Sequence, residues 1–145
     1  MLSELAYEQI EGNFWYAEYG LFRVVMMKDI GYINASEMCS SNGKEYSDWA
    51  HENQDLINAL RSMMDNEHDT SPTSIFVEPG DTPNKKLISG TYCHPDLIPH
   101  IACWVSGSFA LVCNRIVNDY VAAAMVGLTL DKYESDGSEL DESEQ

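Results

Sequence analysis

The chain has 145 residues, of which 44% are hydrophobic, including three Trp, eight Tyr and four Phe. This length and apolar content suit one globular domain and exclude a disordered chain. Twenty-four acidic residues against eight basic ones give a net charge of −16, which argues against indiscriminate nucleic-acid binding. The first residues form no basic-then-apolar leader, and no run of about twenty apolar residues stands out, so we expect an intracellular protein that does not contact a membrane.

The first third of the chain predicts strands joined by a tight turn. Residues 1–20 are expected to form an N-terminal extension, a helix and then a strand, packed on a main domain at residues 21–125. Residues 21–28 are mostly apolar and rich in β-formers, which predicts a strand. A turn at Asp29-Ile30-Gly31 then allows Tyr32-Ile33 to pair back in the antiparallel sense.

A helix, a glycine turn and a longer helix follow. Asn34 is a predicted helix cap, and Glu37 stands three residues later, as in a capping box. Residues 40–43 have the composition of a turn. The next segment predicts one longer amphipathic helix, because apolar residues recur there with a period near 3.6, at Trp49, Leu56, Ile57, Leu60, Met63 and Met64. This arrangement is typical of helix-turn-helix modules.

Residues 74–78 and 86–92 predict two strands of a hairpin whose tip contains two prolines, a candidate wing. His94-Pro95-Asp96 then predicts the start of a helix, and a second apolar helix follows the Ser106-Gly107-Ser108 break. Residues 131–145 are acidic and poor in apolar side chains, so we expect a disordered tail there.

Two groups of motifs in this order carry a family resemblance. The first runs through residues 22–29, Gly31-Tyr32-Ile33-Asn34-Ala35-Ser36, Cys39, Gly43-Lys44 and Trp49. The second runs through Gly90-Thr91-Tyr92, residues 94–102, Trp104, residues 109–111, Ile116-Val117-Asn118 and Tyr120. Together they resemble the KilA-N domain of phages and large eukaryotic DNA viruses, which is similar to the DNA-binding domain of fungal APSES transcription factors. The resemblance implies an α+β, winged helix-turn-helix-like fold with a small antiparallel sheet and four to five helices.

The resemblance also implies a DNA-binding face, made by the helix after Gly43 and by the hairpin before Gly90. Asn and Gln side chains can bond adenine edges, and Lys neutralises phosphate. The implied contact residues are Lys44, Tyr46, Ser47, His51, Asn53, Gln54, Asn84, Lys85 and Lys86.

The chain departs from the family pattern in its charge. Glu37 stands where members usually carry a lysine, and the presumed recognition segment holds four acids, Glu45, Asp48, Glu52 and Asp55. Acidic side chains repel the phosphate backbone, because phosphate neutralisation dominates DNA affinity. The alternative is therefore a repurposed protein-interaction domain, or a DNA mimic, whose acidic face binds a basic host or viral protein.

No catalytic motif is recognisable, so we expect the chain not to be an enzyme and to carry no cofactor. Cys93, His94, His100 and Cys103 could supply soft ligands for zinc, but the same residues match a pattern of the resembled family that holds no metal. We therefore expect no metal site and reduced thiols. The sequence leaves the oligomeric state open.

Overall fold

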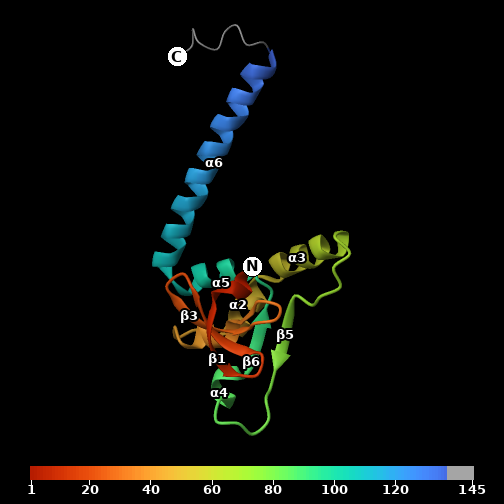
Figure 1. Ribbon diagram of the computed structural model, residues 1–145, viewed down its shortest axis with the longest axis vertical. Coiled ribbons are helices and arrows are strands. Elements are labelled where there is room, and N and C mark those ends of the chain that lie inside the picture. The colour runs from red at the N-terminus through yellow and green to blue at the C-terminus, as the bar shows by residue number, and fades with distance from the viewer. Residues whose placement is uncertain (137–145) are drawn as a thin grey trace. The chain divides into compact units, whose positions relative to one another are not determined.

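The computed structural model describes residues 1–136 and divides the chain into two compact units, Met1–Phe109 and Ala110–Gln145 (Figure 1). A 3-10 helix, Leu2–Leu5, opens the chain. The elements that follow are β1 (Ala6–Glu11), β2 (Phe14–Tyr19), β3 (Phe22–Met27), β4 (Tyr32–Asn34), α1 (Ala35–Ser40), α2 (Tyr46–Glu52), α3 (Gln54–Asn66), β5 (Ser74–Val77), α4 (Lys85–Ile88), β6 (Gly90–Cys93), α5 (Ile98–Val105) and α6 (Gly107–Asp136).

The six strands form one antiparallel sheet in the order β1-β2-β3-β4-β6-β5. The predicted pairing of the residues around the Gly31 turn is confirmed, since Met26 lies opposite Ile33 and Met27 lies opposite Tyr32. Strands β5 and β6 also pair, as expected of the candidate wing. The predicted α+β class is therefore confirmed.

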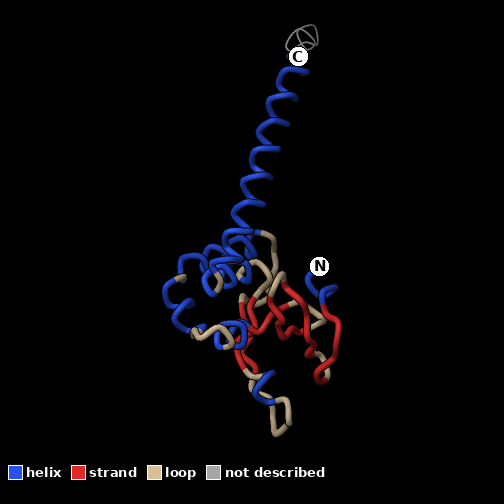
Figure 2. Tube along the Cα trace, turned by 90° about the vertical axis from the view of Figure 1, so that its left-hand side faces the viewer, coloured by secondary structure: helices blue, strands red, loops and turns tan. Residues whose placement is uncertain are grey.

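Apolar side chains fill both faces of the sheet because successive residues of a strand point to opposite sides. Val24 and Met26 of β3 belong to the larger core, which also contains Met38 of α1, Trp49 of α2 and Ile101 of α5. The neighbouring β3 residues, Val25 and Met27, instead pack with Tyr32 and Tyr92 in a smaller cluster. Figure 2 shows the larger helices of the first unit gathered on one side of the strands, apart from the N-terminal 3-10 helix and α4.

The N-terminal segment differs from the prediction of a helix followed by one strand. Its helix is a single 3-10 turn, and residues 6–19 form a hairpin of two strands at the edge of the sheet. Gly12 turns the chain with a φ of +58°, a conformation that glycine adopts without steric cost. Asn13 then fixes the hairpin to the β3–β4 turn, since its Nδ2 donates to Asp29 Oδ1 at 2.7 Å.

The single long helix predicted after Gly43 is wrong, because the chain breaks at Asn53 into α2 and α3. Asn53 has φ −120° and ψ 30°, outside helical values. Its side-chain amide donates to the carbonyl of Trp49 at 2.8 Å. An asparagine side chain competes in this way with the backbone for hydrogen bonds, which favours helix ends.

The second hairpin strand was expected over residues 86–92, but Lys85–Ile88 form the short helix α4 and the strand begins only at Gly90. Two interactions hold this turn of helix. The Ser89 hydroxyl donates to the Lys85 carbonyl at 2.6 Å. The buried amide of Asn34 donates to the carbonyls of Leu87 and Ser89, at 3.2 and 2.9 Å.

Helix α6 is longer and more apolar than expected. It continues through Asp136, so residues 131–136 of the expected disordered tail are helical; residues 137–145 lie outside the described residues. Leu130 to Glu134 contain no glycine or proline, which lets the helix continue. Its segment Gly107–Leu128 has a mean hydropathy of 1.3 and, by length and composition alone, could cross a membrane. The sequence prediction missed this stretch because four polar residues interrupt the apolar run.

Candidate nucleic-acid interface

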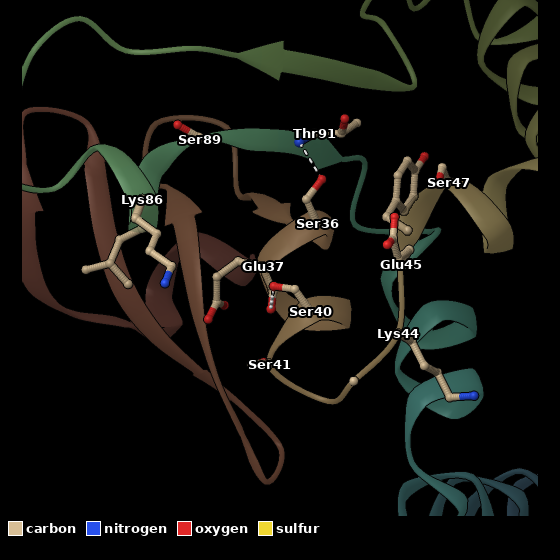
Figure 3. A pocket seen from close by; sticks show the side chains of 13 residues that line it. Ser36, Glu37, Ser40, Ser41, Lys44, Glu45, Ser47, Lys86, Ser89 and Thr91 are labelled. Atoms are coloured by element: carbon tan, nitrogen blue, oxygen red, sulfur yellow. Dashed lines mark hydrogen bonds between the residues drawn. The ribbon is translucent and has the colours of Figure 1, made fainter.

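A groove of about 930 Å³ opens between α1, the segment that leads into α2, and the α4–β6 segment. Figure 3 shows α1 between the two flanking segments, with Lys86 on the α4 side and Ser47 on the α2 side. Most of the residues that line it have polar side chains. The lining residues are Ser36, Glu37, Ser40, Ser41, Gly43, Lys44, Glu45, Tyr46, Ser47, Lys86, Leu87, Ser89 and Thr91.

Asn34 joins two walls of this groove. Its side-chain Oδ1 accepts from the backbone N–H of Glu37 at 3.0 Å, which confirms it as the predicted cap of α1. Its Nδ2 holds the α4 segment through the two carbonyls of Leu87 and Ser89. The fully buried side chain of Asn34 therefore forms hydrogen bonds with backbone groups of α1 and of the α4 segment, which are about fifty residues apart in the sequence.

Gly90 and Ser36 hold the same two elements together from the strand side. The Ser36 hydroxyl accepts from the backbone N–H of Thr91 at 2.9 Å. A Cβ placed on Gly90 would lie 2.6 Å from Asn34 Oδ1 and 2.7 Å from Ser36 Cβ. Gly90 also has a φ of +137°, so the close approach of α1 to β6 requires glycine.

The structure brings four of the nine implied DNA contacts into the groove lining: Lys44, Tyr46, Ser47 and Lys86. Of the four acids of the alternative prediction, Glu45 alone lines the groove. Asp48, Glu52 and Asp55 are exposed but lie outside the lining. The remaining implied contacts outside the lining are His51, Asn53, Gln54, Asn84 and Lys85.

Tyr46 is an anchor of α2 in the core. It is half-buried, its ring stacks on Trp49 with centroids 5.9 Å apart, and its hydroxyl accepts from the Cys93 thiol at 3.4 Å. Burial raises the pKa of Tyr46 above its usual value and raises the pKa of Cys93 to about 11. Both groups therefore stay neutral near pH 7, and Tyr46 offers little surface to a ligand.

The three amide side chains that sequence reasoning assigned to base edges are already engaged within the protein. Asn53 and Gln54 donate back to the carbonyls of Trp49 and Ala50, at 2.8 and 2.9 Å. Asn84 donates to Glu11 Oε1 at 3.1 Å. The sequence could not show these bonds, because the identity of an Asn or Gln residue does not reveal whether its side-chain amide is hydrogen-bonded within the protein.

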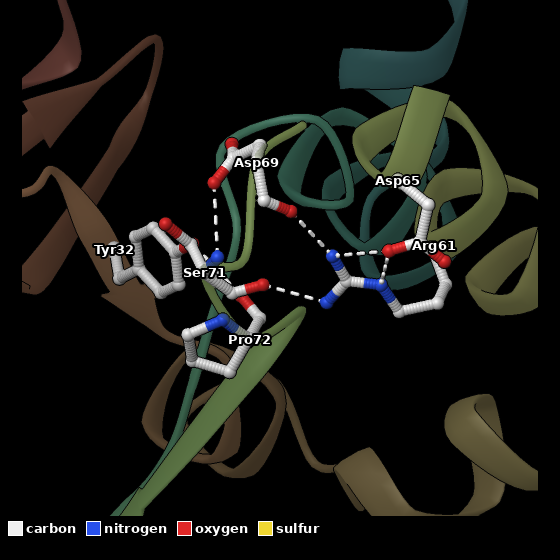
Figure 4. Close-up of polar contacts among 6 residues, drawn as sticks. All are labelled: Tyr32, Arg61, Asp65, Asp69, Ser71 and Pro72. Carbon is white, nitrogen blue, oxygen red and sulfur yellow. Dashed lines mark hydrogen bonds and ion pairs between the residues drawn. The ribbon is translucent and has the colours of Figure 1, made fainter. Parts of the chain in front are cut away.

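Most cations of the first unit are also engaged. Lys44 lies over the Trp104 ring at 4.6 Å and turns toward α5 (Figure 3). Arg61 bonds Asp65 and the carbonyls of Asp69 and Ser71, and so fixes the loop before β5 (Figure 4). In contrast, the ammonium groups of Lys85 and Lys86 contact no carboxylate or ring among the described residues, and both side chains are exposed.

Glu37 is a groove residue that the sequence marked as part of a capping box and as a departure from the family pattern, but not as a member of a site. Its Oε1 is buried and has no hydrogen-bond partner within residues 1–136. Burial raises the pKa of Glu37 above its usual value, and the nearby Arg23 offsets part of that effect. The lysine-to-acid departure at this position was the signal that could have marked it.

Glu37→Gln is expected to raise the free energy of unfolding at pH 7. A carboxyl whose pKa is raised on folding binds its proton more tightly in the native state, so its ionisation weakens the fold as pH rises past the unfolded pKa. Because the side chain is partly exposed, solvent screening limits the gain to roughly 0.5 kcal/mol. Urea titrations at pH 4 and pH 7 measure this, and the gain should be larger at pH 7. An equal gain at both pH values would contradict the prediction.

Comparison with known proteins identifies relatives of the chain. The KilA-N domain model matches residues 17–123. The putative KilA-N domain-containing protein R904 of Acanthamoeba polyphaga mimivirus is 32% identical over 86% of the chain and 36% of its own length. Protein 313L of Invertebrate iridescent virus 6, also called a putative KilA-N domain-containing protein, is 31% identical over 82% of the chain and 34% of its own length.

Another relative, the uncharacterized protein FPV248 of fowlpox virus, is 34% identical over 81% of the chain and 78% of its own length. The chain thus spans about a third of the length of the mimivirus and iridescent-virus relatives but most of the fowlpox protein. No solved structure matches the chain significantly.

Proposed function

Because the chain belongs to the KilA-N domain family, we propose that it is a DNA-binding module that holds the phosphate backbone along the groove and the adjoining α4. The observation that carries this proposal is the position of Lys85 and Lys86. Both ammonium groups are exposed and uncommitted, and Lys86 lines the groove. The proposal assigns the chain to the cytoplasm or nucleus of an infected cell.

The local charge supports this choice of surface. The groove is lined by two lysines and two glutamates, so its lining has no net charge in a chain of −16. Lys85 stands beside it and adds a positive charge. A polyanion meets the least repulsion there, because interactions between exposed charges fade beyond a Debye length of about 8 Å at physiological salt.

Serine hydroxyls of the groove lining supply the remaining contacts. Ser40, Ser41 and Ser47 are exposed in the lining, with Ser40 and Ser41 on the α1 side and Ser47 on the α2 side (Figure 3). The Ser40 and Ser41 hydroxyls donate to the carbonyls of Glu37 and Met38, at 3.3 and 3.2 Å, and would exchange these bonds for bonds to phosphate. Hydroxyls bond phosphate oxygens or base edges of either type, so they position a duplex without strict sequence choice. With two or three lysines in contact, we expect weak and strongly salt-dependent binding.

Replacing both Lys85 and Lys86 with Ala is expected to weaken duplex binding and to flatten its salt dependence. Each lost phosphate contact removes about 0.9 from the slope of log K against log salt, so the pair removes about 1.8. Fluorescence anisotropy of a labelled random duplex measures both quantities.

The matched control for Lys86→Ala alone is Lys28→Ala, which removes one positive charge from a residue outside the groove. The Lys28 ammonium lies over the Trp15 ring at 4.0 Å. This control should keep most of the salt slope. Equal losses in the two single variants would show that net charge alone, not the α4 surface, sets the affinity.

A second candidate function rests on the acidic ridge of α2 and α3, Glu45, Asp48, Glu52 and Asp55. All four carboxylates are exposed, and none forms an ion pair with a described residue. This ridge suits a basic protein partner, because charge complementarity speeds and selects association. The double variant Asp48→Asn, Glu52→Gln separates the two functions. If the chain binds DNA, the variant should bind DNA more tightly than wild type. If the chain binds a basic protein, the variant should bind that protein more weakly.

A further inference from the structure

We propose that α6 pairs with α6 of a second copy of this chain, as an antiparallel helix pair centred between Ile116 and Val117. This inference concerns the second unit and does not depend on the DNA-binding proposal. It rests on three features of the helix: its apolar side chains are exposed, its apolar pattern is unchanged when the helix is reversed, and its charged side chains lie outside the apolar stripe.

A run of apolar side chains on one side of α6 is exposed, although Leu111, Met125 and Val126 add exposed apolar side chains on the other side. Val112, Ile116, Val117, Tyr120 and Val121 are between 49% and 73% exposed. At about 100° per residue these positions, with Ala124 and Leu128, fall within one half of the helix circumference. The candidate membrane-spanning window that contains this stripe is 0% buried.

The exposed apolar area of the stripe is as large as the largest patches on monomeric proteins. Its six large side chains, at roughly 100 Å² each, expose about 600 Å² of contiguous apolar area, the upper end of what monomers show. Ala124 and the partly exposed Cys113 extend it. The total is comparable with the roughly 800 Å² that each partner buries in a standard interface.

The pattern of the stripe is self-complementary when the helix is reversed. About a two-fold axis between Ile116 and Val117, Val112 lies opposite Val121 of the second copy, and Cys113 lies opposite Tyr120 of the second copy. Each contact occurs twice, as an isologous interface requires. This symmetry is the argument for a second copy of this chain rather than an unrelated helix.

The charges of the segment allow this pairing. Residues 110–128 contain one Arg and one Asp, so this part of the helix is neutral in a chain of −16 and two copies can approach without repulsion. Arg115 and Asp119 lie outside the stripe, so pairing through the stripe buries neither charge.

A lipid bilayer suits this helix less well, although its length and composition are sufficient. Asn114, Arg115, Asn118 and Asp119 occupy the side opposite the stripe. A transmembrane position would place all four in hydrocarbon, where a central Arg or Asp costs about 3 kcal/mol each. A helix–helix interface leaves these side chains in water.

Sedimentation equilibrium of the full chain tests the interface. We expect a reversible dimer, and we expect Ile116→Glu to weaken it at least tenfold. Leu111→Glu is the matched control: Leu111 is as exposed as Ile116, at 63% against 62%, but points about 140° away around the helix. It should leave the dimer unchanged. A wild-type monomer at every concentration, or equal losses in both variants, would overturn the proposal.

A disulfide test checks the orientation. Under mild oxidation, Tyr120→Cys should give a covalent dimer through Cys113 of the second copy, and adding Cys113→Ser should abolish it. The wild-type chain should form no Cys113–Cys113 cross-link. Such a cross-link would show a parallel pair and overturn the antiparallel arrangement, as would flotation of a monomeric wild-type chain with phospholipid vesicles.

Discussion

Asn34→Ala is expected to lower the free energy of unfolding by about 3 kcal/mol, a large fraction of the stability of a chain of this size. The loss has two parts. Removing the cap of α1 costs about 1 kcal/mol. The carbonyls of Leu87 and Ser89 lose their donor, and an unsatisfied buried polar group costs about 1–3 kcal/mol. Thermal and urea unfolding measure the change.

Two comparison variants separate these parts. Asn34→Asp keeps an acceptor for the Glu37 N–H but removes the donor, so it should remain strongly destabilised. Asn42→Ala removes a side chain that is exposed and donates only to the Met38 carbonyl, and it should cost less than 1 kcal/mol. An Asn34→Asp protein as stable as wild type would mean that the donor bonds to the α4 segment contribute nothing.

Gly90→Ala is expected to destabilise the protein by at least about 3 kcal/mol and to weaken DNA binding. Its φ of +137° lies in a region that residues with a Cβ rarely adopt, and backbone strain of this kind costs about 1–3 kcal/mol. The added Cβ would also lie 2.6 Å from Asn34 Oδ1, which forces α1 and β6 apart. The groove lies between these elements, so Lys86 moves relative to the serines of α1. Urea unfolding and anisotropy measure the two effects.

Gly80→Ala is the control, since a Cβ there meets nothing within 4 Å. It should be nearly neutral in both assays. The Asn34→Ala, Gly90→Ala double variant should lose less than the sum of the single losses, because the nearest contact of the new Cβ has been removed. Strict additivity would contradict the close approach of Asn34 to Gly90.

The parts of the fold that were predictable from sequence are those fixed by neighbouring residues. The β3–β4 hairpin follows from an apolar run and from Gly31, and the cap of α1 follows from Asn34 and its spacing to Glu37. Motifs spread along the chain identified the family, whose model matches residues 17–123. These signals do not depend on how distant segments pack.

The parts that were missed depend on distant contacts. Helix α4 is held by Asn34, more than fifty residues earlier, so local β-propensity at Leu87-Ile88 pointed to a strand instead. The break at Asn53 and the engaged amide of Asn84 are likewise side-chain contacts that no periodicity reveals. Four of the contacts implied by the family pattern line one groove in the structure. The pattern alone could not separate a core anchor such as Tyr46 from the uncommitted lysines.

The measurement that tests DNA binding most directly is the anisotropy of a labelled random duplex, titrated with the full wild-type chain between about 50 and 200 mM salt. We expect binding in the micromolar range at the lowest salt and a log–log slope of about −2 to −3, the value for two or three neutralised phosphates. No binding at the lowest salt, or binding that salt does not weaken, would contradict the account and leave the acidic ridge as the functional surface.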